Sequence, residues 1–300
     1  MSAPEPLFIL APPRSFTSVA CAMIGSHPQM CGLPETNLFA ADSYEELTRL
    51  YRLRPRFQHG LLRAVAELGL GGQAESDIEA AKRWLEENSH LTSAEMFNDI
   101  RNWAAPRAVV EKSPMFVFLE GALDRIVDAY PEARFLHLTR HPRGTLESNY
   151  ETRQMQEKAT GKMGLGRSDE GDDNMTPEKM WLQPHLRVME TLETLPPDNY
   201  MTLRGESFMS APDVYLPQIC EWLGISTAQA DVDRMMKPEL SPFACMGPSN
   251  APLGNDPNFL RSPELRPYKE KESDLDSPMS WDDSLHFDEA VQHYAMYFGY

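Results

Sequence analysis

The sequence of 300 residues contains few cysteines and no long apolar run. Its four cysteines form no CxxC pair and no regular spacing, which argues against a disulfide framework and indicates reduced thiols. No stretch approaches the roughly 18 consecutive apolar residues of a membrane span, and the N-terminus lacks the basic and apolar regions of a secretory signal. We therefore expect a cytoplasmic protein without a membrane span.

Basic residues are also scarce: the sequence has 28 Lys and Arg residues against 45 Asp and Glu residues, which gives a net charge of −17. This charge argues against general binding of nucleic acid or of an anionic membrane. It is compatible with one small anionic ligand, because a few Arg and Lys residues can form a local positive pocket. No cluster of residues has metal-ligand spacing, so we expect no metal site.

Two common nucleotide-binding motifs are missing too. There is no glycine between Ala11 and Gly25 and no lysine in that stretch, so the first loop is not a GxxxxGK[ST] phosphate loop. The GxGxxG pattern of dinucleotide-binding folds does not follow this strand either. Any nucleotide must therefore be held by a different constellation.

The most informative stretch that is present covers residues 7–25, LFILAPPRSFTSVACAMIG. Residues 7–10 predict a buried strand, residues 14–18 a tight turn, and residues 19–24 the helix that follows. Backbone N–H groups at such a helix N-terminus bind anions, and Arg14 adds a planar fork suited to phosphate or sulfate. The stretch therefore predicts an anion-binding loop.

Further strands are expected before Leu33 and over residues 107–112, 134–139 and 199–203, with helices between them. This alternation predicts an α/β fold with a central, mainly parallel sheet of about five strands flanked by helices. We expect one domain over residues 1–300 with a helical insertion at 40–105, in which residues 44–70 read as one helix. The polar, glycine-containing segment 151–178 reads as a mobile loop or lid.

Functional side chains are expected where the strands end. Glu35 follows the second strand, Lys112 ends the third, and Arg140 ends the fourth, with Ser148 eight residues farther on. The carboxyl ends of parallel strands are where α/β sheets bind ligands. Taken singly, Glu35 can also be a helix-capping acid and Lys112 a surface lysine.

The chain resembles the sulfotransferases that use 3′-phosphoadenosine 5′-phosphosulfate (PAPS). Residues 12–18 resemble the 5′-phosphosulfate loop of that family, residues 135–150 its 3′-phosphate motif, and residues 200–207 its LRYEDL segment. His27-Pro28 and the final Phe-Gly-Tyr also recur in bacterial members. Gly205 is a departure, because it stands where the family usually has tyrosine.

The resemblance implies a P-loop-hydrolase-like fold, PAPS as donor, adenosine 3′,5′-bisphosphate (PAP) as product, and no metal. Glu35 is the expected general base, Lys112 and Arg14 stabilise charge, and His185 is the reserve base. The residues expected to bind PAPS are Arg14, Ser15, Phe16, Thr17, Ser18, Arg140, Ser148 and Arg261.

The predicted reaction is transfer of a sulfuryl group to a hydroxyl, less readily to an amine, of a small or carrier-bound acceptor. Two alternatives remain open at this point. One is a kinase-like phosphotransferase, which would need Mg²⁺ and a phosphate-loop lysine. The other is a non-catalytic nucleotide-binding module that keeps the anion loop.

Overall fold

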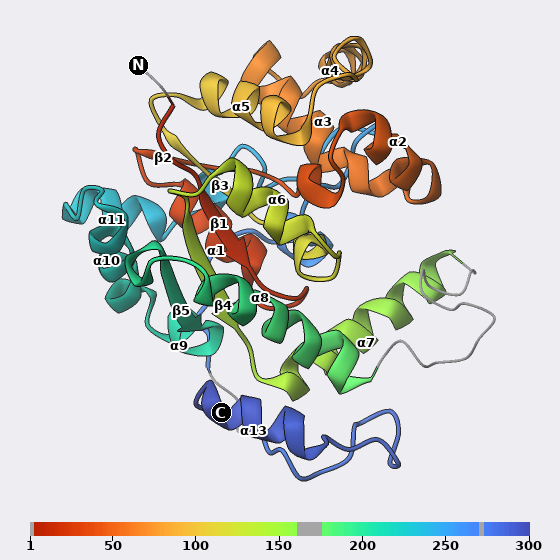
Figure 1. Ribbon diagram of the computed structural model, residues 1–300, viewed down its shortest axis with the longest axis vertical. Coiled ribbons are helices and arrows are strands. Elements are labelled where there is room, and N and C mark those ends of the chain that lie inside the picture. Colours follow the sequence, from red (N-terminus) through yellow and green to blue (C-terminus); the bar gives the residue numbers. More distant parts are fainter. Residues whose placement is uncertain (1–2, 161–175, 270–272) are drawn as a thin grey trace.

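The computed structural model of the protein describes residues 3–160, 176–269 and 273–300. Five parallel strands form one sheet in the order β2-β3-β1-β4-β5, as Figure 1 shows. The strands are β1 (Leu7–Leu10), β2 (Met30–Gly32), β3 (Ala108–Glu111), β4 (Arg134–Thr139) and β5 (Tyr200–Arg204). The expected α/β fold with a five-stranded parallel sheet is confirmed.

Helices connect the strands and cover both faces of the sheet (Figure 1). They are α1 (Thr17–Gly25), α2 (Tyr44–Leu53), α3 (His59–Val65), α4 (Glu75–Glu87), α5 (Ser93–Ala104), α6 (Ala122–Ala129), α7 (Pro142–Thr160), α8 (Gln183–Glu193), α9 (Gly205–Ser210), α10 (Pro212–Leu223), α11 (Gln229–Met235), α12 (Pro257–Arg261) and α13 (Glu289–Tyr297).

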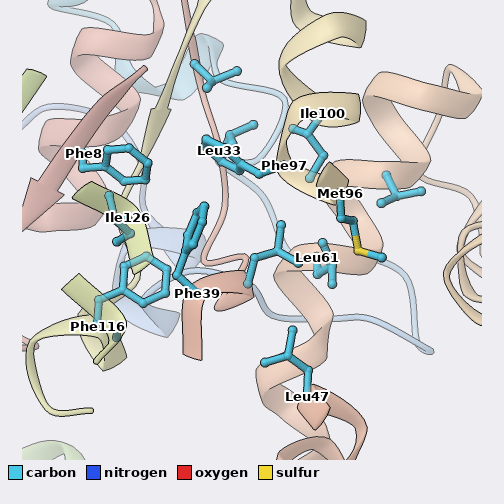
Figure 2. Close-up of a cluster of buried hydrophobic side chains, with 14 of the residues drawn as sticks. Phe8, Leu33, Phe39, Leu47, Leu61, Met96, Phe97, Ile100, Phe116 and Ile126 are labelled. Atoms are coloured by element: carbon cyan, nitrogen blue, oxygen red, sulfur yellow. The ribbon is translucent and has the colours of Figure 1, made fainter. Parts of the chain in front are cut away.

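The sheet separates two apolar cores because successive strand residues point to opposite faces. In β1, Phe8 and Leu10 enter the core shared with α2–α6 and α8, whereas Leu7 and Ile9 enter the core shared with α1 and α9–α11. Figure 2 shows the first core, where the aromatic rings of Phe8, Phe39 and Phe97 pack against one another. Strands buried on both faces read as short apolar runs, which is why the sequence predicts them well.

The helices α2–α5 lie between β2 and β3, and this region is more broken than the sequence suggests. The predicted helix over residues 44–70 is divided into α2, α3 and short helical turns. The break falls at Arg54, which precedes Pro55, because a residue before proline is disfavoured in the helical conformation.

The sequence predicts a loop over residues 151–178, but the first part of this segment is helical. Residues 151–160 form the end of α7 rather than a loop. Residues 161–175, which make up most of the expected lid, lie outside the described residues. The missed helix is polar, and without an apolar stripe the sequence offered no periodic signal there.

All four cysteines are free thiols, and three of them are buried: Cys21, Cys31 and Cys220. Among the helices of the described chain, none has the length and apolar character needed to cross a membrane. A search of the same residues for groups of His, Cys, Asp and Glu able to hold a metal ion finds none.

A close approach between α3 and the segment after β2 generates a stability prediction. A Cβ atom on Gly60 would lie 2.0 Å from the carbonyl oxygen of Glu35. Replacing glycine by alanine within a helix normally raises the free energy of unfolding by about 0.5–1 kcal/mol. Forcing two packed backbone segments apart lowers it by about 1–3 kcal/mol. We expect Gly60→Ala to lower the free energy of unfolding by about 1–2 kcal/mol in urea denaturation. A stabilised variant would show that the two segments are not in contact.

Candidate active site

The anion loop (residues 12–18) leads from β1 into α1 and has an uncommon backbone. Arg14 and Phe16 adopt left-handed conformations, with φ of 69° and 62°. Residues other than glycine rarely do so, and such strain is concentrated at functional sites. The first turn of α1 has no acidic residue and no side-chain cap, so its N–H groups are available to an anion.

The centre of the site is the ammonium group of Lys112, immediately after β3. Its Nζ donates to Ser18 Oγ at 2.8 Å and to Glu35 Oε1 at 2.7 Å. The Lys112 side chain is fully buried, whereas that of Glu35 is 30% exposed. The ammonium therefore joins the anion loop to a carboxylate that reaches solvent.

A second carboxylate, Glu111, precedes Lys112 at the end of β3 and is 0% exposed. Its Oε1 accepts hydrogen bonds from Thr36 Oγ1 (2.9 Å) and Ser113 Oγ (2.5 Å), and its Oε2 accepts one from the Lys112 N–H (2.8 Å). Burial raises the pKa of Glu111 to about 7, although these hydrogen bonds favour the charged form. The sequence analysis missed this residue; the signal was an acidic residue closing the apolar strand AVVE.

Arg140, directly after β4, and Ser148, in α7, lie beside the anion loop. Arg14 Nε donates to Ser148 Oγ at 2.9 Å, and Arg140 Nη1 donates to the carbonyl oxygen of Arg14 at 2.5 Å. Burial and the neighbouring Arg140 lower the pKa of Arg14, and burial lowers the pKa of Arg140. Two close, partly buried guanidinium groups form a site that a multiply charged anion would stabilise.

Phe16 and Gly205 fit together next to Arg140. The Arg140 guanidinium lies 4.6 Å from the centroid of the Phe16 ring. A Cβ atom on Gly205 would lie 2.5 Å from Phe16 Cδ2 and 2.9 Å from the Thr139 carbonyl oxygen. Glycine at position 205 therefore makes room for the Phe16 ring, which accounts for the departure from the tyrosine expected there.

Several polar atoms in this region are buried without a hydrogen-bond partner among the described residues. They are Ser15 Oγ, Arg140 Nε and Thr145 Oγ1. Buried polar groups are nearly always satisfied, so a cluster of exceptions beside two arginines fits a missing polar ligand. Thr145, in the first turn of α7, was not singled out by the sequence analysis.

The C-terminal half supplies Asp256, a further residue that the sequence analysis did not single out. Its carboxylate forms an ion pair with Arg14, and its N–H donates to Ser18 Oγ at 3.3 Å. Arg261, proposed as a PAPS ligand, is exposed, and Nη1 donates to Asn258 Oδ1 at 3.4 Å. The loop around residue 255 therefore reaches the anion loop through Asp256, while Arg261 points to a different neighbour.

His185 is not among the residues gathered around Lys112. It is fully buried in α8, where its Nδ1 lies 2.8 Å from Nε2 of His137. Its ring also packs against Trp181 and Phe298. The His185 side chain is thus covered by described residues, whereas the Glu35 side chain is partly exposed.

Together these residues form an anion site with an acid–base group at its border. The loop amides, Lys112, Arg14 and Arg140 supply positive charge, and Glu35 supplies a carboxylate held against the ammonium. Such an arrangement can bind a phosphate-bearing donor, stabilise charge on a departing oxyanion and accept a proton.

A parallel α/β sheet with a strand-loop-helix anion site at its carboxyl edge is typical of proteins that bind the phosphate groups of nucleotides. Residues 6–229 match the sequence model of the Sulfotransferase family, so the chain belongs to that family. A search of curated protein sequences finds no match. The protein is thus an enzyme of sulfuryl transfer, not a kinase-like phosphotransferase.

Solved structures show the same fold over the whole chain. The sulfotransferase domain of the curacin biosynthetic pathway has a TM-score of 0.76 and 21% identity, covering 100% of this chain and 99% of that domain. The sulfotransferase domain of the Synechococcus PCC 7002 olefin synthase has a TM-score of 0.75 and 21% identity, covering 100% and 96%. At this identity the similarity establishes the fold.

The buried histidine pair predicts acid sensitivity. Burial lowers the pKa of His137 to about 3 and that of His185 well below its usual value. Below about pH 6.5 the unfolded chain protonates both rings while the folded protein does not. The unfolded state then binds more protons, so the free energy of unfolding decreases as the pH falls.

We expect His185→Gln to reduce the slope of unfolding free energy against pH, between pH 6.5 and 4.5, by up to about 1.4 kcal/mol per pH unit. Urea denaturation at several pH values measures this slope. Identical slopes for the variant and the original protein would contradict the assignment of neutral, buried rings.

Proposed function

We propose that the protein transfers the sulfuryl group of PAPS to a hydroxyl acceptor, less readily to an amine, with Glu35 as general base. The observation that carries this proposal is the Lys112 ammonium, which donates both to Ser18 of the anion loop and to Glu35. The Lys112 ammonium would therefore contact both the donor phosphate on the anion loop and Glu35, which would activate the acceptor. Family membership supports the reaction class.

The side chains around the anion loop suit a nucleotide that carries phosphate groups at both the 3′ and the 5′ position of its ribose. Ser15, Thr17, Ser18 and the loop amides would hold the 5′-phosphosulfate, with Lys112 and Arg14. Arg140 and Ser148 would hold the 3′-phosphate, and the partnerless Arg140 Nε and Ser15 Oγ are free to donate. Phe16, stacked with Arg140, would border the nucleotide. Asp256 would leave Arg14 when an anion binds there.

When bound, PAPS supplies a sulfuryl group on a phosphate oxygen that departs with its electron pair. By analogy with phosphoryl transfer, the protein acts by positioning and by electrostatic stabilisation. Lys112 and Arg14 would stabilise the departing phosphate oxygen. Glu35 would accept the proton of the acceptor hydroxyl as its oxygen bonds to sulfur, a contribution of about 10²–10⁴-fold.

The acceptor side is proposed to lie toward the helical insertion, with the whole chain acting as one domain. The backbone of Glu35 is held from two directions, because its N–H donates to the Gly254 carbonyl at 2.7 Å and Gly60 of α3 packs on its carbonyl. Residues 40–105, which include α3, would therefore shape the acceptor pocket. The predicted lid over residues 151–178 falls mostly outside the described residues. Both structural neighbours belong to biosynthetic systems, which supports carrier-bound hydroxyls beside small molecules as acceptors.

Arg140 tests the assignment of the donor. We expect Arg140→Ala to weaken PAP binding by about 10- to 100-fold, the loss of charge-assisted hydrogen bonds, and to weaken adenosine 5′-phosphate binding far less. Isothermal titration calorimetry without Mg²⁺ compares the two ligands on both proteins. Equal losses for the two ligands would show that Arg140 does not face a 3′-phosphate.

Glu35 tests the assignment of the base. We expect Glu35→Gln to keep PAP affinity within about threefold and to lower turnover by about 10²-fold or more. Turnover is measured with ³⁵S-labelled PAPS and a panel of alcohols, phenols and hydroxyacyl pantetheine thioesters. Glu45→Gln, on the exposed side of α2, is the matched control and should behave like the original protein. Near-normal turnover in Glu35→Gln would place the base elsewhere.

A further inference from the structure

The segment that carries Glu35 is not a regular element, so something must hold it. Residues 33–37 follow β2, and Asn37 has a left-handed backbone with φ of 54°. Thr36 is 0% exposed and Asn37 is 2% exposed, so the chain turns inward directly after the proposed base. The polar groups of this buried turn need partners inside the protein.

Glu111 supplies those partners from the end of β3. It binds Thr36 directly, and it binds Ser113, whose Oγ accepts the Asn37 N–H at 2.9 Å. Its other oxygen accepts the N–H of Lys112. One fully buried carboxylate therefore contacts both the turn behind Glu35 and the backbone of the lysine that pairs with Glu35.

We infer that Glu111 is a positioning residue. It holds Glu35 in the position needed to accept a proton and Lys112 in the position needed to stabilise charge. This inference rests on the proposed function for the roles of Glu35 and Lys112. Glu111 itself has no exposed surface and so does not touch the acceptor or donor. Burying a carboxylate costs free energy unless the group is hydrogen-bonded. Three donors converge on the Glu111 carboxylate, and these hydrogen bonds fix the relative positions of Thr36, Ser113 and Lys112.

Two substitutions disturb this arrangement by different routes. Glu111→Gln keeps the size of the side chain but replaces one acceptor oxygen by a donor, so all three hydrogen bonds cannot persist. Thr36→Val keeps the shape of Thr36 and removes its hydroxyl, which donates to Glu111 and accepts the Leu38 N–H at 3.4 Å. Tyr130→Phe is the matched control, because it deletes a buried hydroxyl bonded to Ala94 and Asn98 of α5, away from Glu111.

The first readout is independent of catalysis. We expect amide hydrogen exchange in a peptide covering residues 33–40 to accelerate by about threefold to tenfold in Glu111→Gln and Thr36→Val. Exchange there should be unchanged in Tyr130→Phe. Unchanged exchange in both test variants would overturn the inference, whether or not the protein transfers sulfuryl groups.

The second readout asks whether Glu111 acts through Glu35. With ³⁵S-labelled PAPS, we expect kcat to fall by up to about 100-fold in Glu111→Gln, with the KM for PAPS within about threefold. The double variant Glu35→Gln/Glu111→Gln should be no slower than Glu35→Gln alone, because the two changes remove one function. Multiplied losses would show a general structural effect and overturn the inference. Absence of transfer by the original protein would instead count against the proposed function, and the exchange readout would still decide on Glu111.

Discussion

The buried ammonium of Lys112 is the constraint on which the rest of the site depends. A fully buried charge is tolerated only when it is paired and hydrogen-bonded, and Lys112 finds its partners in Ser18 and Glu35. Those partners come from two other segments of the chain: the start of α1 and the turn after β2. The need to satisfy one charge therefore brings the anion loop and the proposed base to a common point.

The parallel sheet makes that convergence possible. β1, β3 and β4 are adjacent and parallel, so their carboxyl ends present the anion loop, Lys112 and Arg140 along one edge. The backbone of Arg140 is held there by Trp181, whose Nε1 donates to its carbonyl at 2.7 Å. The same fold also carries acidic groups into the positive site: Asp256 on Arg14 and Glu111 next to Lys112. Opposite charges are thus balanced locally at this edge of the sheet, within a protein whose net charge is −17.

The features that the sequence could predict are those encoded locally. β1 is a continuous apolar run, and β4 contains the apolar residues Phe135, Leu136 and Leu138. The bounds of both strands agree with expectation, while β3 and β5 differ by about a residue at their ends. The juxtaposition of Arg14, Arg140 and Ser148 follows from the order of strand ends and family motifs. Asp256 and Glu111 were missed because each has a partner distant in sequence, Arg14 and Thr36 respectively. Thr145 was missed because its burial follows only from the fold. The polar end of α7 was missed because it has no apolar periodicity.

The central claim is that one anion site binds both ends of an adenosine bisphosphate beside Glu35. A crystal structure of the protein with PAP tests it most directly. We expect the 5′-phosphate on the N–H groups of residues 15–18 and within hydrogen-bond distance of Lys112, the 3′-phosphate on Arg140 and Ser148, and Asp256 displaced from Arg14. PAP bound at another place, or bound with the Arg14–Asp256 ion pair intact and Lys112 out of reach, would contradict the account.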